Sequence, residues 1–112
     1  MNCIFCKIIA GEIPGKSVYR DDDVVVIEDV NPQAPHHLLV MPVVHAENLE
    51  EFTVSQPPEL VAKLFRIAAR LGREHGEGGF RIAINTGAQG GQTVDHLHVH
   101  VLSGRQMHWP PG

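Results

Sequence analysis

The most regular pattern of hydrophobic and polar positions lies in the middle of the chain and is helical. Apolar residues recur there at spacings of three and four, between Pro57-Pro58 and Gly76. Proline suits a first helical turn and glycine ends helices, so we predict the longest helix between these points, with Ser55 as its cap. The positions on its apolar stripe are Leu60, Leu64, Ile67, Ala68 and Leu71. Val61 and Phe65 widen the stripe, which fits either a broader core contact or an interface with a second copy of the chain.

Shorter apolar runs bounded by turn residues predict strands. They are residues 17–20 and 24–28, joined as a hairpin through three aspartates, and residues 37–41, 80–85 and 97–102. Short helices are expected at residues 3–10 and 45–52. Together these elements predict an α+β fold with about five strands in a mostly antiparallel sheet, one main helix and a short N-terminal helix. The whole chain, 1–112, fits a single domain.

Composition narrows the class of protein. Nine Lys and Arg residues are scattered along a chain of net charge −4, so we expect no surface for nucleic acid. No apolar stretch is long enough to cross a membrane, and the chain does not open with a basic segment followed by an apolar one. We therefore expect a cytoplasmic location, where paired cysteines are more often ligands or free thiols than a disulfide.

Three histidines, His96, His98 and His100, alternate with apolar residues near the C-terminus. In a strand, alternate side chains share a face, so the imidazoles would line one surface while the apolar residues between them enter the core. Imidazole can act as a nucleophile, an acid, a base or a metal ligand near neutral pH. The row therefore indicates catalysis or metal binding, although three structural histidines would give the same pattern.

A glycine-rich loop immediately precedes the histidine row. Gly90 and Gly91 let the backbone approach a ligand closely. Thr93 adds a hydroxyl and Asn85 a side-chain amide. These groups suit an anion such as phosphate, whereas a plain connection between two strands also uses glycine. With a phosphate here, His98 at the centre of the row is the natural nucleophile, because neutral imidazole attacks phosphorus and later leaves readily.

Cys3 and Cys6 form a C-x-x-C pair of the kind that binds zinc. A zinc site needs four ligands, and only histidines remain to supply the other two. His45 follows a predicted strand end and His96 opens the histidine row, so these two are the candidates. Two buried thiols on a short helix are the alternative interpretation.

Three further polar residues lie near the predicted strand ends. His36 and His37 are adjacent, so a strand would send them to opposite faces, one into the cleft and one to the surface. Asp29 lies between a strand and a loop. Its carboxylate would either cap that loop or accept hydrogen bonds from the hydroxyls of a sugar.

Together these motifs resemble the histidine triad (HIT) family, whose motif is His-x-His-x-His followed by apolar residues. More narrowly, the chain looks like the Hint branch, the purine nucleoside phosphoramidases. The closer match rests on Ile4–Ile9, Asn31–Pro35, Gly90–Val94 and Gly104–Gly112. The resemblance covers essentially the whole chain.

The resemblance implies a role for each candidate residue. His98 would form a nucleotidyl-histidine intermediate. The catalytic set would be His98, His96, His100 and His37. The α-phosphate would contact Asn85, Gly91 and Thr93, and the ribose would contact Asp29. The purine pocket would be walled by Ile4, Phe5, Ile8, Ile27 and Val30, with Trp109 near the site of the partner subunit.

The implied activity is hydrolysis of the P–N bond in adenosine or guanosine 5′-phosphoramidates by a homodimer. The resemblance also implies a structural zinc ion at Cys3, Cys6, His45 and His96, with no cofactor needed for catalysis. Two other functions stay open: a HIT-family dinucleoside polyphosphate hydrolase, and a non-catalytic nucleotide- or zinc-binding regulatory module. The chain departs from the family at Ile27, where close relatives often carry an aromatic residue, and at Asp95, where they commonly carry an uncharged one.

Overall fold

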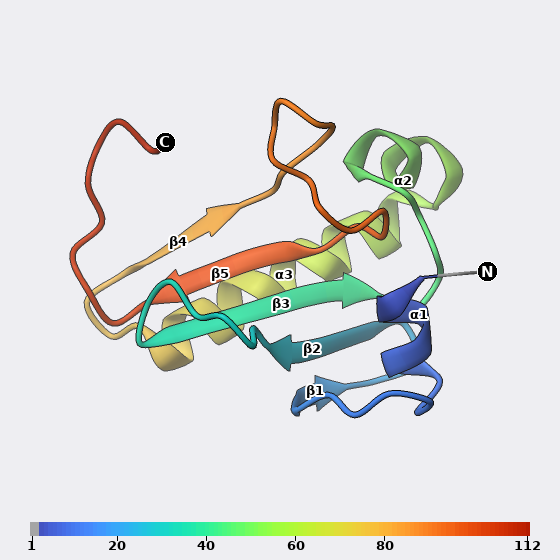
Figure 1. The fold of residues 1–112 in the computed structure, drawn as a ribbon, viewed down its shortest axis with the longest axis horizontal. Coiled ribbons are helices and arrows are strands. Elements are labelled where there is room, and N and C mark those ends of the chain that lie inside the picture. The colour runs from blue at the N-terminus through green and yellow to red at the C-terminus, as the bar shows by residue number, and fades with distance from the viewer. Residues whose placement is uncertain (1–2) are drawn as a thin grey trace.

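The fold is a five-stranded antiparallel sheet with helices on both faces (Figure 1). The computed structural model describes residues 3–112, so Met1 and Asn2 of the predicted domain lie outside the described residues. In chain order the elements are α1 (Ile4–Ile9), β1 (Ser17–Arg20), β2 (Val24–Glu28), β3 (His36–Pro42), α2 (Leu49–Ser55), α3 (Pro58–His75), β4 (Phe80–Ala83) and β5 (Val99–Ser103). Neighbouring strands follow the order β1-β2-β3-β5-β4, and each pair is antiparallel. The predicted α+β class is confirmed.

Both faces of the central strands are buried because α3 covers one face and α1 lies on the other (Figure 1). Alternate side chains of β2 therefore enter different apolar clusters. Val24 and Val26 pack under α3. Val25 and Ile27 pack on the opposite face, with Phe5 of α1. Burial on both faces explains why β2 is apolar at four consecutive positions.

Helix α3 is the one that the hydrophobic pattern predicted. The buried residues of its stripe are Leu64, Ile67, Ala68 and Leu71, while Leu60 and Val61 are partly buried against the same core. Phe65 stays 36% exposed. Gly72 permits a close approach of β4, because a Cβ there would lie 2.5 Å from the ring of Phe80. Within residues 3–112, no helix combines the length and the apolar character needed to cross a membrane.

The predicted start of α3 near Pro57-Pro58 is confirmed, but its predicted cap and the predicted bounds of α2 need correction. Asn48 caps α2 by accepting a 2.9 Å hydrogen bond from the backbone N–H of Glu51, so this helix begins at Leu49 rather than at residue 45. It then continues through Ser55. Ser55 is therefore helical and cannot cap α3. The N-cap position of α3 is Pro57, which makes no side-chain capping bond. The shift leaves residue 45 in an irregular segment.

The histidine row is only partly a strand. β5 begins at Val99, so only His100 of the three lies in it, and β4 ends at Ala83 rather than at residue 85. The strand pairing does not extend back from Val99 to Leu97, because Leu97 donates its N–H to the carbonyl oxygen of Ala46, 2.8 Å away, instead of to a neighbouring strand. Alternation nevertheless holds through the row. Leu97, Val99 and Val101 all enter the core under α3, which leaves the histidines on the face of α1.

Candidate functional site

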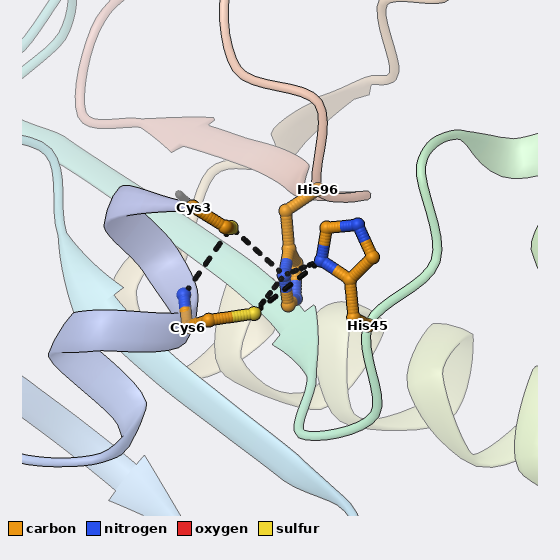
Figure 2. A group of neighbouring side chains, drawn as sticks. All are labelled: Cys3, Cys6, His45 and His96. Atoms are coloured by element: carbon orange, nitrogen blue, oxygen red, sulfur yellow. Dashed lines mark hydrogen bonds between the residues drawn. The ribbon is translucent and has the colours of Figure 1, made fainter. Parts of the chain in front are cut away.

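Four side chains from three distant segments meet beside α1 (Figure 2). Cys3 and Cys6 come from the start of α1, His45 from the segment after β3 and His96 from the segment before β5. The Sγ of Cys6 lies 3.3 Å from Nδ1 of His45 and 3.5 Å from Nδ1 of His96. The Sγ of Cys3 lies 3.5 Å from Nδ1 of His96, and the two nitrogens are 3.2 Å apart. All four atoms lie within 4.8 Å of one another.

These separations fit a tetrahedral zinc site. With Zn–S at about 2.3 Å and Zn–N at about 2.0–2.1 Å, a tetrahedron places sulfur and nitrogen about 3.6 Å apart and two nitrogens about 3.3 Å apart. The donor chemistry also fits. Nε2 of His96 lies 2.9 Å from the carbonyl oxygen of Pro42, so Nε2 carries the proton and Nδ1 keeps its lone pair for a metal. Four protein ligands leave no open position, which is the arrangement of structural zinc.

Without a cation, the protein favours the uncharged forms of two of these residues, Cys6 and His96. Burial, together with the neighbouring Cys3 thiol, raises the pKa of the Cys6 thiol to about 11. Burial also lowers the pKa of His96, so its ring stays neutral and keeps a lone pair. A bound divalent cation would favour the thiolate over the thiol at the two cysteines, because its positive charge stabilises the thiolate. The cluster is therefore preformed for a cation.

His98 is held so that one ring nitrogen is engaged and the other is free. Its Nδ1 lies 2.8 Å from the carbonyl oxygen of His96, so Nδ1 is the donor. In the neutral ring, Nε2 then keeps its lone pair. The ring of Phe5 packs edge-on against His98, with centroids 5.0 Å apart, and the centroid of the His100 ring also lies 5.0 Å from that of His98. The side chain is buried, so packing and the hydrogen bond together fix its orientation.

A hydrogen-bonded row of His100, His37 and Asp29 lies next to His98. Nε2 of His37 is 2.9 Å from Nδ1 of His100 and 3.4 Å from Oδ2 of Asp29. Nδ1 of His37 accepts the backbone N–H of Gln33 at 3.0 Å. A neutral His37 must therefore carry its proton on Nε2 and donate it to one of these two partners. His100 accepts on Nδ1, so its own proton in the neutral ring is on Nε2.

The same hydrogen bonds make this row a poor metal site. Asp29, His37 and His100 place three donor atoms within 4.8 Å of one another. Coordination through Nε2 of His37 would move its proton to Nδ1, where it would face the N–H of Gln33. The row is therefore built to hold protons rather than a cation.

Burial keeps the two histidines of the row uncharged near neutral pH. Burial, reinforced by the positive charges that His98 and His37 can carry, lowers the pKa of His100 to about 4, and Asp29 opposes this shift. Burial also lowers the pKa of His37, again opposed by Asp29. Neutral rings at both positions can donate on one nitrogen and accept on the other, which is the requirement for passing a proton.

The residues predicted to bind a phosphate come from one loop region. Asn85 follows β4, and its Nδ2 donates to the carbonyl oxygen of Gly90 at 2.7 Å. Gly91 has φ of 84°, a left-handed conformation that favours glycine, and a Cβ there would lie 3.8 Å from Nδ2 of Asn85. Thr93 is exposed two residues later. The structure thus places the Asn85 amide against the glycine backbone.

The predicted purine pocket is assembled only in part. Phe5, Ile8 and Ile27 share the apolar cluster on the face of α1, the same face as the histidines. Ile4, Val30 and Trp109 lie outside that cluster and are 48%, 100% and 81% exposed. The structure therefore supplies one apolar wall beside His98 and leaves these three residues facing outward.

Two polar predictions can be checked directly. Asp29 does cap its loop, because Oδ1 accepts the N–H of Asn31 at 2.8 Å, while Oδ2 faces His37. His36 and His37 do lie on opposite faces. His37 enters the histidine site, and His36 is exposed with its ring 5.4 Å from that of His75.

The sequence did not reveal the backbone groups that orient the rings. They are the carbonyl oxygens of Pro42 and His96 and the N–H of Gln33. Backbone N–H and carbonyl groups are common to nearly all residue types, so the sequence does not reveal where they point, and their direction follows only from the fold. The Asn31-Pro32 turn was the available signal for Gln33, because it returns the chain toward His37.

Comparison with known proteins assigns the family. The family model described as "HIT domain" matches residues 10–107. The crystal structure of a HIT family hydrolase from Legionella pneumophila superposes with a TM-score of 0.93 and 42% sequence identity, covering 99% of this chain and 100% of that chain. The fold is thus that of a histidine triad protein. The chain belongs to the HIT domain family.

Two further relatives carry zinc in their names. A 14 kDa zinc-binding protein from Zea mays is 44% identical over 112 residues, which span 97% of this chain and 87% of that protein. A Zn-bound histidine triad family protein from Mycobacterium smegmatis has a TM-score of 0.81 at 37% identity, covering 94% of this chain and 76% of that one. Zinc is also the metal that the donor geometry of the Cys/His cluster fits.

We predict one zinc ion per chain in protein expressed in zinc-containing medium. Cys6→Ala should abolish its retention, because three ligands bind a structural zinc ion far more weakly than four. Elemental analysis of dialysed protein measures the stoichiometry. His36→Ala, which removes an exposed imidazole outside the cluster, is the matched control and should keep the metal. Wild-type protein that leaves dialysis without zinc would contradict the assignment.

We predict that the free energy of unfolding falls as the pH is lowered from about 6.5 to about 4. The pKa of His100 is about 4 in the folded chain against an ordinary value of 6.5, so between these limits the unfolded state binds more protons. In His100→Asn, the loss of unfolding free energy between pH 7 and pH 4.5 should therefore be smaller than in wild type by about 1–2 kcal/mol. Urea unfolding at pH 7 and at pH 4.5 measures the difference.

His108→Asn is the control for this comparison, because His108 is an exposed histidine. Both variants keep the Cys/His cluster, so any loss of metal in acid should lower the unfolding free energy of both equally. If the unfolding free energy of His100→Asn falls with pH as steeply as that of wild type, His100 is not held neutral by the fold.

Proposed function

We propose that this protein hydrolyses the P–N bond of adenosine or guanosine 5′-phosphoramidates, as a member of the Hint branch of its family. The observation that carries the proposal is the setting of His98, whose Nδ1 donates to a backbone carbonyl so that Nε2 keeps a lone pair. The Legionella relative described as a HIT family hydrolase supports hydrolysis as the reaction class. The sequence resemblance at the four motif stretches supports the phosphoramidate substrate.

The proposed reaction has two steps at phosphorus. In the first, Nε2 of His98 attacks the α-phosphorus, a P–N bond to the ring forms, and the P–N bond to the substrate amine breaks. In the second, water attacks the same phosphorus, the bond to His98 breaks, and the nucleoside monophosphate leaves. The ring keeps its proton on Nδ1 throughout. The carbonyl oxygen of His96 can therefore stabilise the positive charge of the intermediate, and the ring departs neutral.

Proton movement is assigned to the row of His100, His37 and Asp29. The leaving amine takes one proton in the first step, and a neutral His100 carries its proton on Nε2 for this purpose. His37 keeps its own Nε2–H and orients His100, because a neutral His37 that gave up this proton would become an anion beside the Asp29 carboxylate. A proton from solvent replaces the one taken from His100, and the attacking water returns a proton to solvent in the second step. The first and second steps together leave the protein unchanged.

The substrate is proposed to lie across the face of α1. Its α-phosphate would contact Asn85, Gly91 and Thr93, which belong to one loop region. Its base would pack against the apolar wall that includes Phe5 and Ile27. Asp29 is half-buried at the end of β2, where a carboxylate can accept hydrogen bonds from ribose hydroxyls.

Zinc has a structural part in this proposal. Bound to Cys3, Cys6, His45 and His96, it would supply a cross-link between the start of α1 and the histidine segment. The ring of His96 would then be a ligand, and its carbonyl oxygen would remain the acceptor for His98.

We predict that His98→Ala abolishes the release of AMP from adenosine 5′-phosphoramidate, with a loss of at least about 10³-fold in kcat/KM. Without His98 the covalent intermediate cannot form, however well the substrate binds, so the defect of His98→Ala should lie in kcat. Steady-state assays of wild type and variant measure it. His36→Ala, which removes an exposed histidine on the other face of β3, is the control and should keep wild-type rates.

Two results would contradict the proposed function. Substantial turnover by His98→Ala would remove the nucleotidyl-histidine mechanism. Faster turnover of diadenosine polyphosphate than of the phosphoramidate by wild-type protein would instead favour the polyphosphate hydrolase.

We also propose that the protein acts as a homodimer. β4 is an edge strand of the sheet, so a second copy can extend the ladder there. Phe65 on α3 is 36% exposed although it continues the apolar stripe of that helix. Trp109 is 81% exposed near the C-terminus, where a partner can cover it.

Light scattering after size exclusion should give twice the chain mass of 12.3 kDa. Phe65→Glu should shift the mass toward the monomer, because a charge in an apolar interface is costly to bury. Val54→Glu is the matched control, since Val54 is an 87% exposed apolar residue on α2. A wild-type mass of one chain at micromolar concentration would contradict the dimer.

A further inference from the structure

The side chain of Gln92 makes more hydrogen bonds than any other part of the glycine-rich loop. Its Nε2 donates to the carbonyl oxygen of Glu47 at 2.7 Å and to that of Val94 at 3.1 Å. Its Oε1 accepts the backbone N–H of Gly87 at 3.1 Å. Three of the four hydrogen bonds that an amide side chain can make are therefore used. The residue is half-buried, whereas Gly91 and Thr93 on either side of it are exposed.

These bonds close the loop on itself. The backbone N–H of Gln92 also donates to the carbonyl oxygen of Gly87 at 3.0 Å, so main chain and side chain clamp the same residue. The backbone N–H of Gly91 donates to the carbonyl oxygen of Ala88 at 3.1 Å, and Nδ2 of Asn85 donates to the carbonyl oxygen of Gly90 at 2.7 Å. The loop shape is thus set by internal hydrogen bonds rather than by apolar packing.

The bond to Glu47 ties the closed loop to the rest of the site. Glu47 lies between His45, a member of the Cys/His cluster, and Asn48, the cap of α2. The adjoining carbonyl oxygen of Ala46 accepts the N–H of Leu97, which lies between the first two histidines of the row. One short segment, residues 45–48, therefore contacts the loop, the cluster and the histidine row.

We propose that Gln92 is a positioning residue, which fixes the backbone of the glycine-rich loop relative to His98 so that the loop can hold the phosphoryl group of a nucleotide. This inference rests on the proposed function, because it takes Gly91 and Thr93 as the phosphate contacts. Gln92 itself points inward to Glu47, Val94 and Gly87 and acts through its two chain neighbours.

The chemistry of the three bonds predicts which substitutions disrupt the loop. Gln92→Met keeps the length of the side chain and loses all three hydrogen bonds. Gln92→Glu can still accept from Gly87, but it places a carboxylate oxygen against the carbonyl oxygens of Glu47 and Val94, which repel it. Both changes should release the loop from residues 45–48 while leaving the apolar wall intact.

Gln89 offers matched controls in the same loop. It is exposed, and it makes no hydrogen bond within the part of the chain that the structure describes. Gln89→Met and Gln89→Glu therefore make the same chemical changes, including the added negative charge near a phosphate, without loss of an anchoring bond.

Calorimetric titration with AMP and with adenosine tests the inference, together with kcat and KM for adenosine 5′-phosphoramidate. We expect both Gln92 variants to bind AMP roughly tenfold more weakly or worse, because each loses anchoring hydrogen bonds of the loop. Adenosine, which has no phosphate, should bind each variant as it binds wild type. The Gln89 variants should match wild type with both ligands.

The outcomes separate this inference from the proposed function. Unchanged AMP affinity in both Gln92 variants would overturn the positioning role. Equal losses for AMP and adenosine would overturn it too, because they would indicate a general structural effect. Wild-type protein that does not hydrolyse the phosphoramidate, while the Gln92 variants still lose AMP selectively, would contradict the proposed function and support the positioning role.

Discussion

The hydrogen bond between Nδ1 of His98 and the carbonyl oxygen of His96 is the interaction on which the site depends. A backbone carbonyl can only accept, so it requires the proton on Nδ1 and leaves the lone pair on Nε2. The same logic applies to two other rings. The carbonyl of Pro42 places the proton of His96 on Nε2, and the N–H of Gln33 places that of His37 on Nε2 as well. Three main-chain groups thus decide which nitrogen of each ring carries the proton and which keeps a lone pair.

His96 joins the two chemical parts of the molecule. Its ring belongs to the Cys/His cluster and its carbonyl oxygen orients His98, so one residue connects a metal-binding geometry with the proposed nucleophile two positions later. Helix α1 completes this connection. Cys3 and Cys6 bring its first turn to the cluster, and Phe5 between them packs on His98 with centroids 5.0 Å apart. A structural metal would therefore hold in place both His98, the proposed nucleophile, and the apolar wall beside it. Bound there, it would order a site whose segments lie far apart in a chain of 112 residues.

Most of the fold could be predicted from periodicity, because α3 and the strands are long enough to show a repeat. The face shared by the three histidines was also predictable, since the alternating Leu97 and Val99 had to enter a core. The strand boundary at Val99 was not, because it depends on Leu97 bonding to Ala46, a long-range contact without a local signal. The Ser55 cap failed for a local reason: Asn48 started α2 later than its apolar residues suggested, so Ser55 fell inside that helix. Ring orientation was beyond sequence reasoning, because it is set by main-chain atoms.

Long-range ¹H–¹⁵N correlation spectra of the imidazole rings, recorded at pH 7.5 on uniformly ¹⁵N-labelled protein, test the central claim most directly. The pattern of couplings identifies which nitrogen of each neutral ring carries the proton. The account predicts the Nδ1–H form for His98 and the Nε2–H form for His96 and His37, assigned by the loss of signals in single variants. A spectrum in which His98 is mainly the Nε2–H form would contradict it, because the nitrogen proposed to attack phosphorus would then have no lone pair available.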